Sequence, residues 1–303
     1  MHPYDYLKIE PHFSLQPQET SSDWLHYEVT FPSACHNHYQ ENDTARGKYF
    51  TPCASGRFPL VILLHGMGER PEKNLVPCMM LARWLTKIGI ASFILQLSVS
   101  VFLIDDLLEL FQVLVINTRQ VIDWAESRDE LDTERVAVVG ISLGGMASAI
   151  AMAVDKRIMA AVFLVAGGNM ENIAWRSKDD GARMGHKCTE SQCHEIYSHY
   201  PQYLADIADR GIENVVPAKE CFLFDPISFA RYLRGRPLLM INADFDDSVP
   251  RDSTLDFWEV CGRPRIVWLP AKHCTIFMQH HSIRAEATAF LESTFGLEHK
   301  VEA

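Results

Sequence analysis

The sequence predicts an α/β protein: a three-layer sandwich in which helices cover both faces of a mostly parallel sheet, with a helical cap inserted into it. Two observations carry this prediction. Continuous apolar runs, typical of strands buried on both faces, alternate along the chain with amphipathic stretches of helical length. Between one such run, residues 135–139, and a stretch rich in small residues, 146–153, stands a serine flanked by glycines, Ser142. Such alternation implies right-handed crossovers, which place helices on both faces of the sheet.

The expected elements follow from the N-terminus. Residues 1–25 read as an irregular polar arm, and residues 24–31 and 47–52 as antiparallel strands at one edge of the sheet. Buried strands are expected at 59–64, 89–97, 135–139, 160–165, 237–242 and 265–269. Helices are expected at 74–88, 105–127, 142–154, 251–261 and 273–295.

One interval of about seventy residues breaks this alternation, because a strand–helix unit needs far fewer. The interval is polar, carries several aromatic residues and lacks a buried-strand run, so we expect a mostly helical cap over the carboxyl ends of the strands. We therefore divide the chain into an arm with edge strands (residues 1–57), a core (58–166 and 237–303) and a cap insertion (167–236).

Charge and hydropathy limit the classes of partner. The net charge of -11 argues against nucleic acid or an anionic membrane surface as a partner. No apolar run is long enough for a membrane span, and the most apolar stretch, 93–103, is interrupted by polar residues. The N-terminus shows no apolar core or cleavage site of a signal peptide. With eight cysteines in no framework spacing, these features predict a cytoplasmic protein with reduced thiols.

A second group of residues resembles a metal site. Cys188, Cys193 and His194 lie close in sequence, with His186 just before them. The spacing of the two cysteines is wide for a zinc site, and no second Cys/His pair follows at a matching distance. We prefer free thiols and solvated histidines here, and expect neither a metal nor an organic cofactor.

Ser142 has the context of a nucleophile. It occupies the centre of a Gly-x-Ser-x-Gly pattern, Gly140 to Gly144, between an expected buried strand and an expected helix. Glycines let the strand and the helix approach closely enough to hold the serine in a strained turn. The turn presents the hydroxyl at the end of the sheet, where the helix N-terminus favours developing negative charge.

The segment His65-Gly66-Met67-Gly68 directly follows another expected buried strand. Gly66 and Gly68 let the backbone turn its N–H groups toward a substrate. The N–H of Met67, together with that of Leu143 after the serine, would form an oxyanion hole, which stabilises the charge that develops during acyl transfer.

A general base and its supporting acid are expected at the ends of the last two strands. His273 follows the strand at 265–269, and it is distinguished from the other histidines by this position. Three aspartates, Asp244, Asp246 and Asp247, follow the strand at 237–242. One of them would orient the histidine and stabilise its imidazolium, and the others would be solvated loop residues or helix caps.

With these motifs in the chain order Ser, Asp, His, the sequence from about Phe58 to Phe295 resembles the α/β-hydrolase superfamily, in particular its esterase and acyl-peptidase-like branch near the dienelactone hydrolases. The resemblance implies that Asp246 is the acid, because Asp246-x-x-Val249-Pro250 fits the pattern of the family with Ala243 in place of a glycine. Lys272 replaces the glycine that usually precedes the histidine, and so adds a cation near the imidazole.

These expectations together describe a serine carboxylesterase-type hydrolase that acts on a small-molecule ester of short to medium acyl chain. Gly66, Gly68 and Trp175 are the expected substrate-binding residues, with Trp175 and other cap aromatics lining a modest apolar pocket. A thioesterase or peptidase with the same triad, and a non-catalytic ligand-binding protein on this fold, remain as alternatives. A homodimer is an alternative to a monomer.

Overall fold

The computed structural model describes residues 2–8, 12–37, 40–67, 71–96, 106–179 and 187–297. Within these residues, nine strands form one sheet in the order β1-β2-β3-β5-β4-β6-β7-β8-β9. The pairs from β1 to β5 along this order are antiparallel, and all pairs from β5 to β9 are parallel. The strands are β1 (Ser14–Thr20), β2 (Trp24–Pro32), β3 (Thr44–Pro52), β4 (Phe58–Leu64), β5 (Ala91–Gln96), β6 (Leu131–Ile141), β7 (Ile158–Leu164), β8 (Leu238–Ala243) and β9 (Arg265–Leu269).

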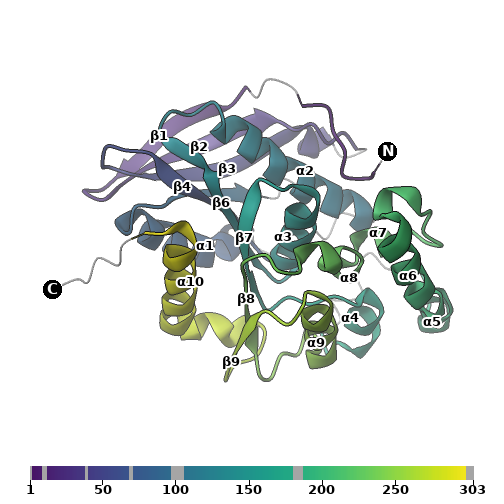
Figure 1. Ribbon diagram of the computed structural model, residues 1–303. Helices are drawn as coiled ribbons and strands as arrows, with labels where there is room; N and C mark the ends of the chain where they lie inside the picture. The colour runs from purple at the N-terminus through teal and green to yellow at the C-terminus, as the bar shows by residue number, and fades with distance from the viewer. Residues whose placement is uncertain are drawn as a thin grey trace.

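Helices cover both faces of this sheet, so the predicted three-layer α/β fold with a mostly parallel sheet is confirmed (Figure 1). One face carries α1 (Pro71–Lys87) and α10 (His280–Phe295), and the other carries α2 (Leu107–Ala125), α3 (Leu143–Val154) and α9 (Arg251–Val260). No helix in the described ranges is long and apolar enough to cross a membrane.

The two faces of the sheet have separate cores because successive side chains of a strand point to opposite sides. In β4, Leu60, Ile62 and Leu64 join the layer of α2 and α3, whereas Val61 and Leu63 join the layer of α1 and α10. Both sets are buried, which explains why the parallel strands read as continuous apolar runs.

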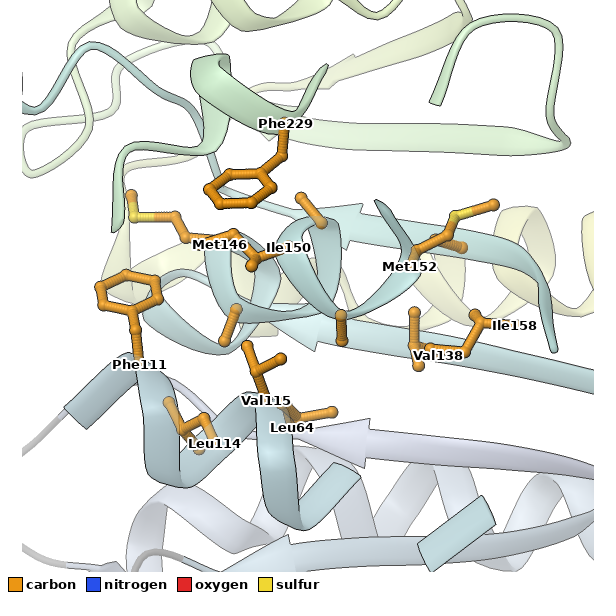
Figure 2. Close-up of a cluster of buried hydrophobic side chains, with 14 of the residues drawn as sticks. Leu64, Phe111, Leu114, Val115, Val138, Met146, Ile150, Met152, Ile158 and Phe229 are labelled. Atoms are coloured by element: carbon orange, nitrogen blue, oxygen red, sulfur yellow. The ribbon is translucent and has the colours of Figure 1, made fainter. Parts of the chain in front are cut away.

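Helix α3 is largely buried and lies between α2 and the short helix α8 (Pro226–Ala230), as Figure 2 shows for Met146 and Ile150 of α3, Phe111 of α2 and Phe229 of α8. Small side chains suit this position because they let neighbouring elements approach closely. The small residues of α3, from which the sequence predicts the helix, therefore also explain its close packing between α2 and α8.

The inserted residues are mainly helical. They contain α4 (Met170–Arg176), α5 (Glu190–Ser198), α6 (Tyr200–Arg210), α7 (Cys221–Phe224), α8, and the 3-10 turns η4 (Ile212–Asn214) and η5 (Arg231–Leu233). The expected place of this segment needs a correction: α7 and α8 pack along the flank of α2 and α3, and α4 lies nearer the strand ends, against α9 (Figure 1). Helices of four and five residues, such as α7 and α8, are too short to show a periodicity that indicates which neighbour they cover.

Buried Asp225 anchors this packing. Its carboxylate accepts the backbone N–H groups of Asn169, Met170 and Ile227 and the hydroxyl of Tyr197, at 2.9–3.0 Å. The helices of the insertion are thereby joined to the loop that leaves β7.

Two further expectations are wrong. The N-terminal arm is not wholly irregular, since β1 lies within it and pairs with β2; its residues are mostly exposed, so it carries no apolar alternation. The expected helix at 273–295 begins instead with the 3-10 turn η6 (Cys274–Gln279), because Gln279 leaves the helical conformation (φ -89°, ψ 25°) before α10 starts.

Candidate active site

Ser142 lies on a tight turn between β6 and α3. Its backbone has φ 53° and ψ -119°, a region that side-chain-bearing residues rarely adopt, and its N–H donates to the carbonyl of Leu164 at 2.8 Å. Two glycines are required for this turn: a Cβ on Gly140 would lie 2.2 Å from the carbonyl oxygen of Gly144, and one on Gly144 2.4 Å from that of Leu64. The close approach of α3 to β4 therefore holds the strained serine in place.

His273 lies between this serine and a carboxylate. Its Nε2 is 2.9 Å from Ser142 Oγ, and its Nδ1 is 2.9 Å from each carboxylate oxygen of Asp246. The side chains of His273 and Asp246 are only 13% and 7% exposed, so the pair is largely removed from water. The three residues come from the ends of β6, β8 and β9, which meet at the carboxyl edge of the sheet.

The carboxylate of Asp246 is itself fixed, since its Oδ1 accepts the backbone N–H groups of Ser248 and Val249 at 2.9 and 2.7 Å. The other two candidate aspartates face elsewhere. Asp244 accepts a hydrogen bond of 3.4 Å from Arg251, and Asp247 lies 3.4 Å from the ammonium of Lys272. The cation that precedes His273 therefore pairs with Asp247.

The turn after β4 lies directly against Ser142. A Cβ on Gly66 would be 3.3 Å from both Ser142 Cβ and the carbonyl oxygen of Ile141. Met67 follows on this turn, and Leu143 is the first residue of α3, where backbone N–H groups have no partner within the helix. His65, whose Nδ1 is 2.7 Å from the Gly66 carbonyl, is buried, and this burial lowers its pKa. Gly68 lies outside the described residues.

Trp175, an expected substrate-binding residue, is not among the residues that the structure groups around Ser142. It lies in a hollow of about 620 Å³ between α4 and α5, and none of Ser142, Asp246 and His273 lines that hollow. Its role in substrate binding thus stays a prediction.

Three residues just after α4 contact the loop that carries Asp246, and sequence reasoning missed them. The hydroxyl of Ser177 and the N–H of Lys178 donate to the Asp247 carbonyl, at 3.2 and 2.9 Å, and Ser248 Oγ donates to Asp179 at 2.9 Å. These contacts join the insertion to the loop that carries Asp246. Backbone and short polar side chains make them, so no sequence pattern could have indicated them.

The cysteine-rich segment of the insertion has other contacts. His194 Nδ1 lies 2.9 Å from Glu171, and Cys193 is buried. Among the residues that the structure describes, no three His, Cys, Asp or Glu side chains are grouped to hold a metal ion; His186 falls outside them. Beside His273, burial and the carboxylates of Asp247 and Asp179 raise the pKa of the Cys274 thiol, which therefore stays protonated near neutral pH.

No family model and no curated protein matches the sequence, whereas many solved structures share its architecture. An acetyl xylan esterase from Paenibacillus sp. R4 superposes with a TM-score of 0.64 at 16% identity, over 94% of this chain and 89% of that chain. Acetyl xylan esterase 1 from Thermoanaerobacterium sp. JW/SL YS485 gives 0.61 at 17% identity, over 95% and 89%. The α/β hydrolase GrgF from Penicillium sp. sh18 gives 0.59 at 17% identity, over 89% and 98%. The protein has the α/β-hydrolase fold.

This α/β-hydrolase fold gathers a hydroxyl, an imidazole and a carboxylate in one hydrogen-bonded row, next to a turn with backbone N–H groups. Such a row can transfer the hydroxyl proton to the imidazole while the carboxylate stabilises the resulting imidazolium. The fold alone does not fix the reaction, because many unrelated functions share it. A function for this protein has to be inferred from the arrangement of Ser142, His273 and Asp246.

Proposed function

We propose that this protein is a serine hydrolase that cleaves carboxylic esters of short to medium acyl chain through an acyl-enzyme. The observation that carries the proposal is the position of His273, with Nε2 2.9 Å from Ser142 Oγ and Nδ1 2.9 Å from Asp246. A histidine that is held on both sides, next to a serine on a strained turn, suits general-base catalysis.

In the proposed reaction, Ser142 Oγ attacks the ester carbonyl carbon while His273 takes the hydroxyl proton. The carbonyl oxygen becomes an oxyanion, which the N–H groups of Met67 and Leu143 would stabilise. The C–O bond to the alcohol then breaks, and His273 gives its proton to the leaving alkoxide. Water, deprotonated by His273, attacks the acyl-enzyme and releases the carboxylic acid and the free serine. As the acyl–oxygen bond breaks, His273 returns the water proton to Ser142 Oγ, so every proton passes through His273 and the free enzyme is restored.

Further observations support the proposal. Three solved structures with this fold, from Paenibacillus, Thermoanaerobacterium and Pyrobaculum calidifontis, are esterases. The segment 167–236, which we propose as the selective insertion, reaches the acid loop through Ser177 and Lys178. All eight cysteines are free thiols, which supports our proposal of a cytoplasmic location.

The decisive experiment compares chromogenic nitrophenyl esters from acetate to dodecanoate with an acyl thioester and a peptide anilide. We expect the highest kcat/KM on the shorter oxygen esters, and none of this turnover in Ser142→Ala. A higher kcat/KM on the thioester or anilide would identify a thioesterase or a peptidase instead. Absence of turnover on every substrate, with no labelling by a fluorophosphonate, would favour a non-catalytic binding protein.

A further inference from the structure

A mostly apolar pocket of about 270 Å³ lies on the face of the sheet that α1 and α10 cover. Its floor consists of Leu63, Val139, Ile141 and Leu164, near the carboxyl ends of β4, β6 and β7. At α1 the pocket reaches the surface, where Val76 and Met80 are each 49% exposed. Apolar side chains with this much exposure at the opening of a concave site indicate a place for an apolar ligand.

This pocket is separate from the candidate catalytic row. None of Ser142, Asp246 and His273 lines it, and Ile141, directly before the nucleophile, belongs to the core layer of α1 and α10. The serine turn with α3 lies on the other face of the sheet.

The charged residues of the pocket all have the same sign. Its lining includes Arg83, Lys87 and Arg284 together with His280, and no Asp or Glu, although the chain as a whole has a net charge of -11. Arg284 stacks over the ring of Trp84, 3.9 Å from its centroid, and has no carboxylate partner among the described residues. Lys87 is half-exposed and lies 3.8 Å from Asp23. A local excess of cations beside an apolar cavity is complementary to an amphipathic anion.

The volume of the pocket limits the size of the ligand that it can hold. An apolar protein cavity of about 150 Å³ is enough for benzene, with its six carbon atoms. In proportion, 270 Å³ corresponds to roughly ten non-hydrogen atoms. This is the size of octanoate.

We propose that the pocket between α1 and α10 is a second ligand site, which binds a medium-chain carboxylate with its chain on the sheet and its carboxylate at Arg284. The proposal concerns binding alone and does not depend on ester hydrolysis. It is therefore tested on the Ser142→Ala protein, which cannot form an acyl-enzyme.

Isothermal titration calorimetry of Ser142→Ala with butanoate, hexanoate and octanoate measures the site directly. The affinity should rise about fourfold per added methylene, since each buried methylene contributes about 0.8 kcal/mol. Octanol, which lacks the charge, should bind at least tenfold more weakly than octanoate. Wild-type protein whose Ser142 has been blocked with a fluorophosphonate should bind octanoate as well as Ser142→Ala does.

Two variants locate the site. Arg284→Gln should weaken octanoate binding about tenfold, while Arg263→Gln, which removes an arginine that stacks on Trp258 outside the pocket, should leave it unchanged. Val76→Trp, at an exposed position, should fill the opening and abolish binding without a large change in thermal unfolding.

Three results would overturn the proposal. One is octanoate binding that is lost when Ser142 is blocked, which would place the ligand in the catalytic site. Another is equal affinity in Arg284→Gln and Arg263→Gln. The third is a dimer that binds no octanoate and that Met80→Glu separates into monomers, which would make this face an interface between two copies.

Discussion

His273 Nε2 and Ser142 Oγ lie 2.9 Å apart although the two residues are 131 positions apart in the chain. Their meeting depends on β6 and β9 ending at the same edge of a parallel sheet, with β7 and β8 between them. The pair joins a strained turn, which fixes the hydroxyl, to a loop that presents the imidazole. Both the proposed chemistry and its most direct test follow from this pair.

The nucleophile prediction concerns Ser142→Ala. This change should lower kcat on nitrophenyl esters by about five or six orders of magnitude, because serine, histidine and aspartate act as one unit. A fluorophosphonate should label Ser142 in the wild type, as peptide mass mapping would show. An adduct on another residue would contradict the assignment.

The acid prediction compares three neighbouring aspartates. Asp246→Asn should lower kcat by about 10⁴, since the amide cannot hold His273 in the required tautomer. Asp244→Asn and Asp247→Asn, which change only pairs with Arg251 and Lys272, should cost about tenfold or less. A crippling effect of Asp247→Asn would instead make that residue the acid.

Features that leave a local pattern in the sequence, such as buried strands and the residues that follow them, could be predicted. The strand β9 coincides with its expected range, and the positions of Ser142 and His273 follow from the rule that site residues come after buried strands. Among the three aspartates, however, local reasoning could not choose; the family resemblance selected Asp246, and only three-dimensional geometry shows which carboxylate faces the imidazole.

Three other features of the structure leave no recognisable pattern in the sequence. The edge strand β1 is solvated on most of its residues, so it lacks apolar alternation. The side of the core that α7 and α8 cover depends on long-range packing of very short helices. The contacts of Ser177 and Lys178 with the acid loop involve groups that every polar loop contains.

The glycine prediction tests the close approach of α3 to β4. Gly144→Ala places a Cβ 2.4 Å from the backbone carbonyl of Leu64, so strand and turn must separate. We expect a loss of about 1–3 kcal/mol in unfolding free energy, and a fall in kcat because Ser142 moves. Gly89→Ala is the control: its positive φ (80°) also strains an alanine, but the site has open space and lies away from the serine. Equal loss of kcat in both variants would contradict this explanation.

The pH prediction concerns His65, whose pKa burial lowers from the ordinary value of 6.5. As the pH falls, the unfolded chain takes up the proton first, so this contribution to stability is complete above about pH 6.5 and decreases as the pH falls toward the folded pKa. The loss approaches about 1.4 kcal/mol per pH unit for one group. Buried His26, whose pKa is lowered for the same reason, adds to it.

Urea unfolding of wild type and His65→Gln between pH 7.5 and 5 measures the contribution of His65 to the pH dependence of the unfolding free energy. The variant should lose less stability over that range than the wild type, whatever its stability at pH 7.5. His281→Gln, at an exposed position, should keep the slope of the wild type. If His65→Gln also keeps that slope, His65 is not the group that titrates.

The last prediction concerns substrate selection by the insertion. Deleting it would remove the buried aromatic cluster of Tyr197, Tyr200 and Phe222 and uncover the faces of α2 and α3 that α7 and α8 cover, so a point substitution is the cleaner test. Trp175 lies two residues before Ser177, which contacts the loop that carries Asp246. The side chain of Trp175 lines the hollow between α4 and α5. If this segment contacts the acyl chain, Trp175→Ala should change the ratio of kcat/KM for octanoate and acetate esters by about tenfold, because each methylene in a fitting pocket contributes under about 1 kcal/mol.

Labelling of Ser142 by the fluorophosphonate should continue at the wild-type rate in Trp175→Ala, because the catalytic row is left intact. Trp24→Ala, which removes a partly buried tryptophan on the distant strand β2, controls for general destabilisation and should leave the ester ratio unchanged. A ratio that stays within twofold of the wild type in Trp175→Ala would show that α4 does not select the acyl chain. Selection would then have to come from residues nearer Ser142, such as the turn at Gly66 and Met67 that lies directly against it.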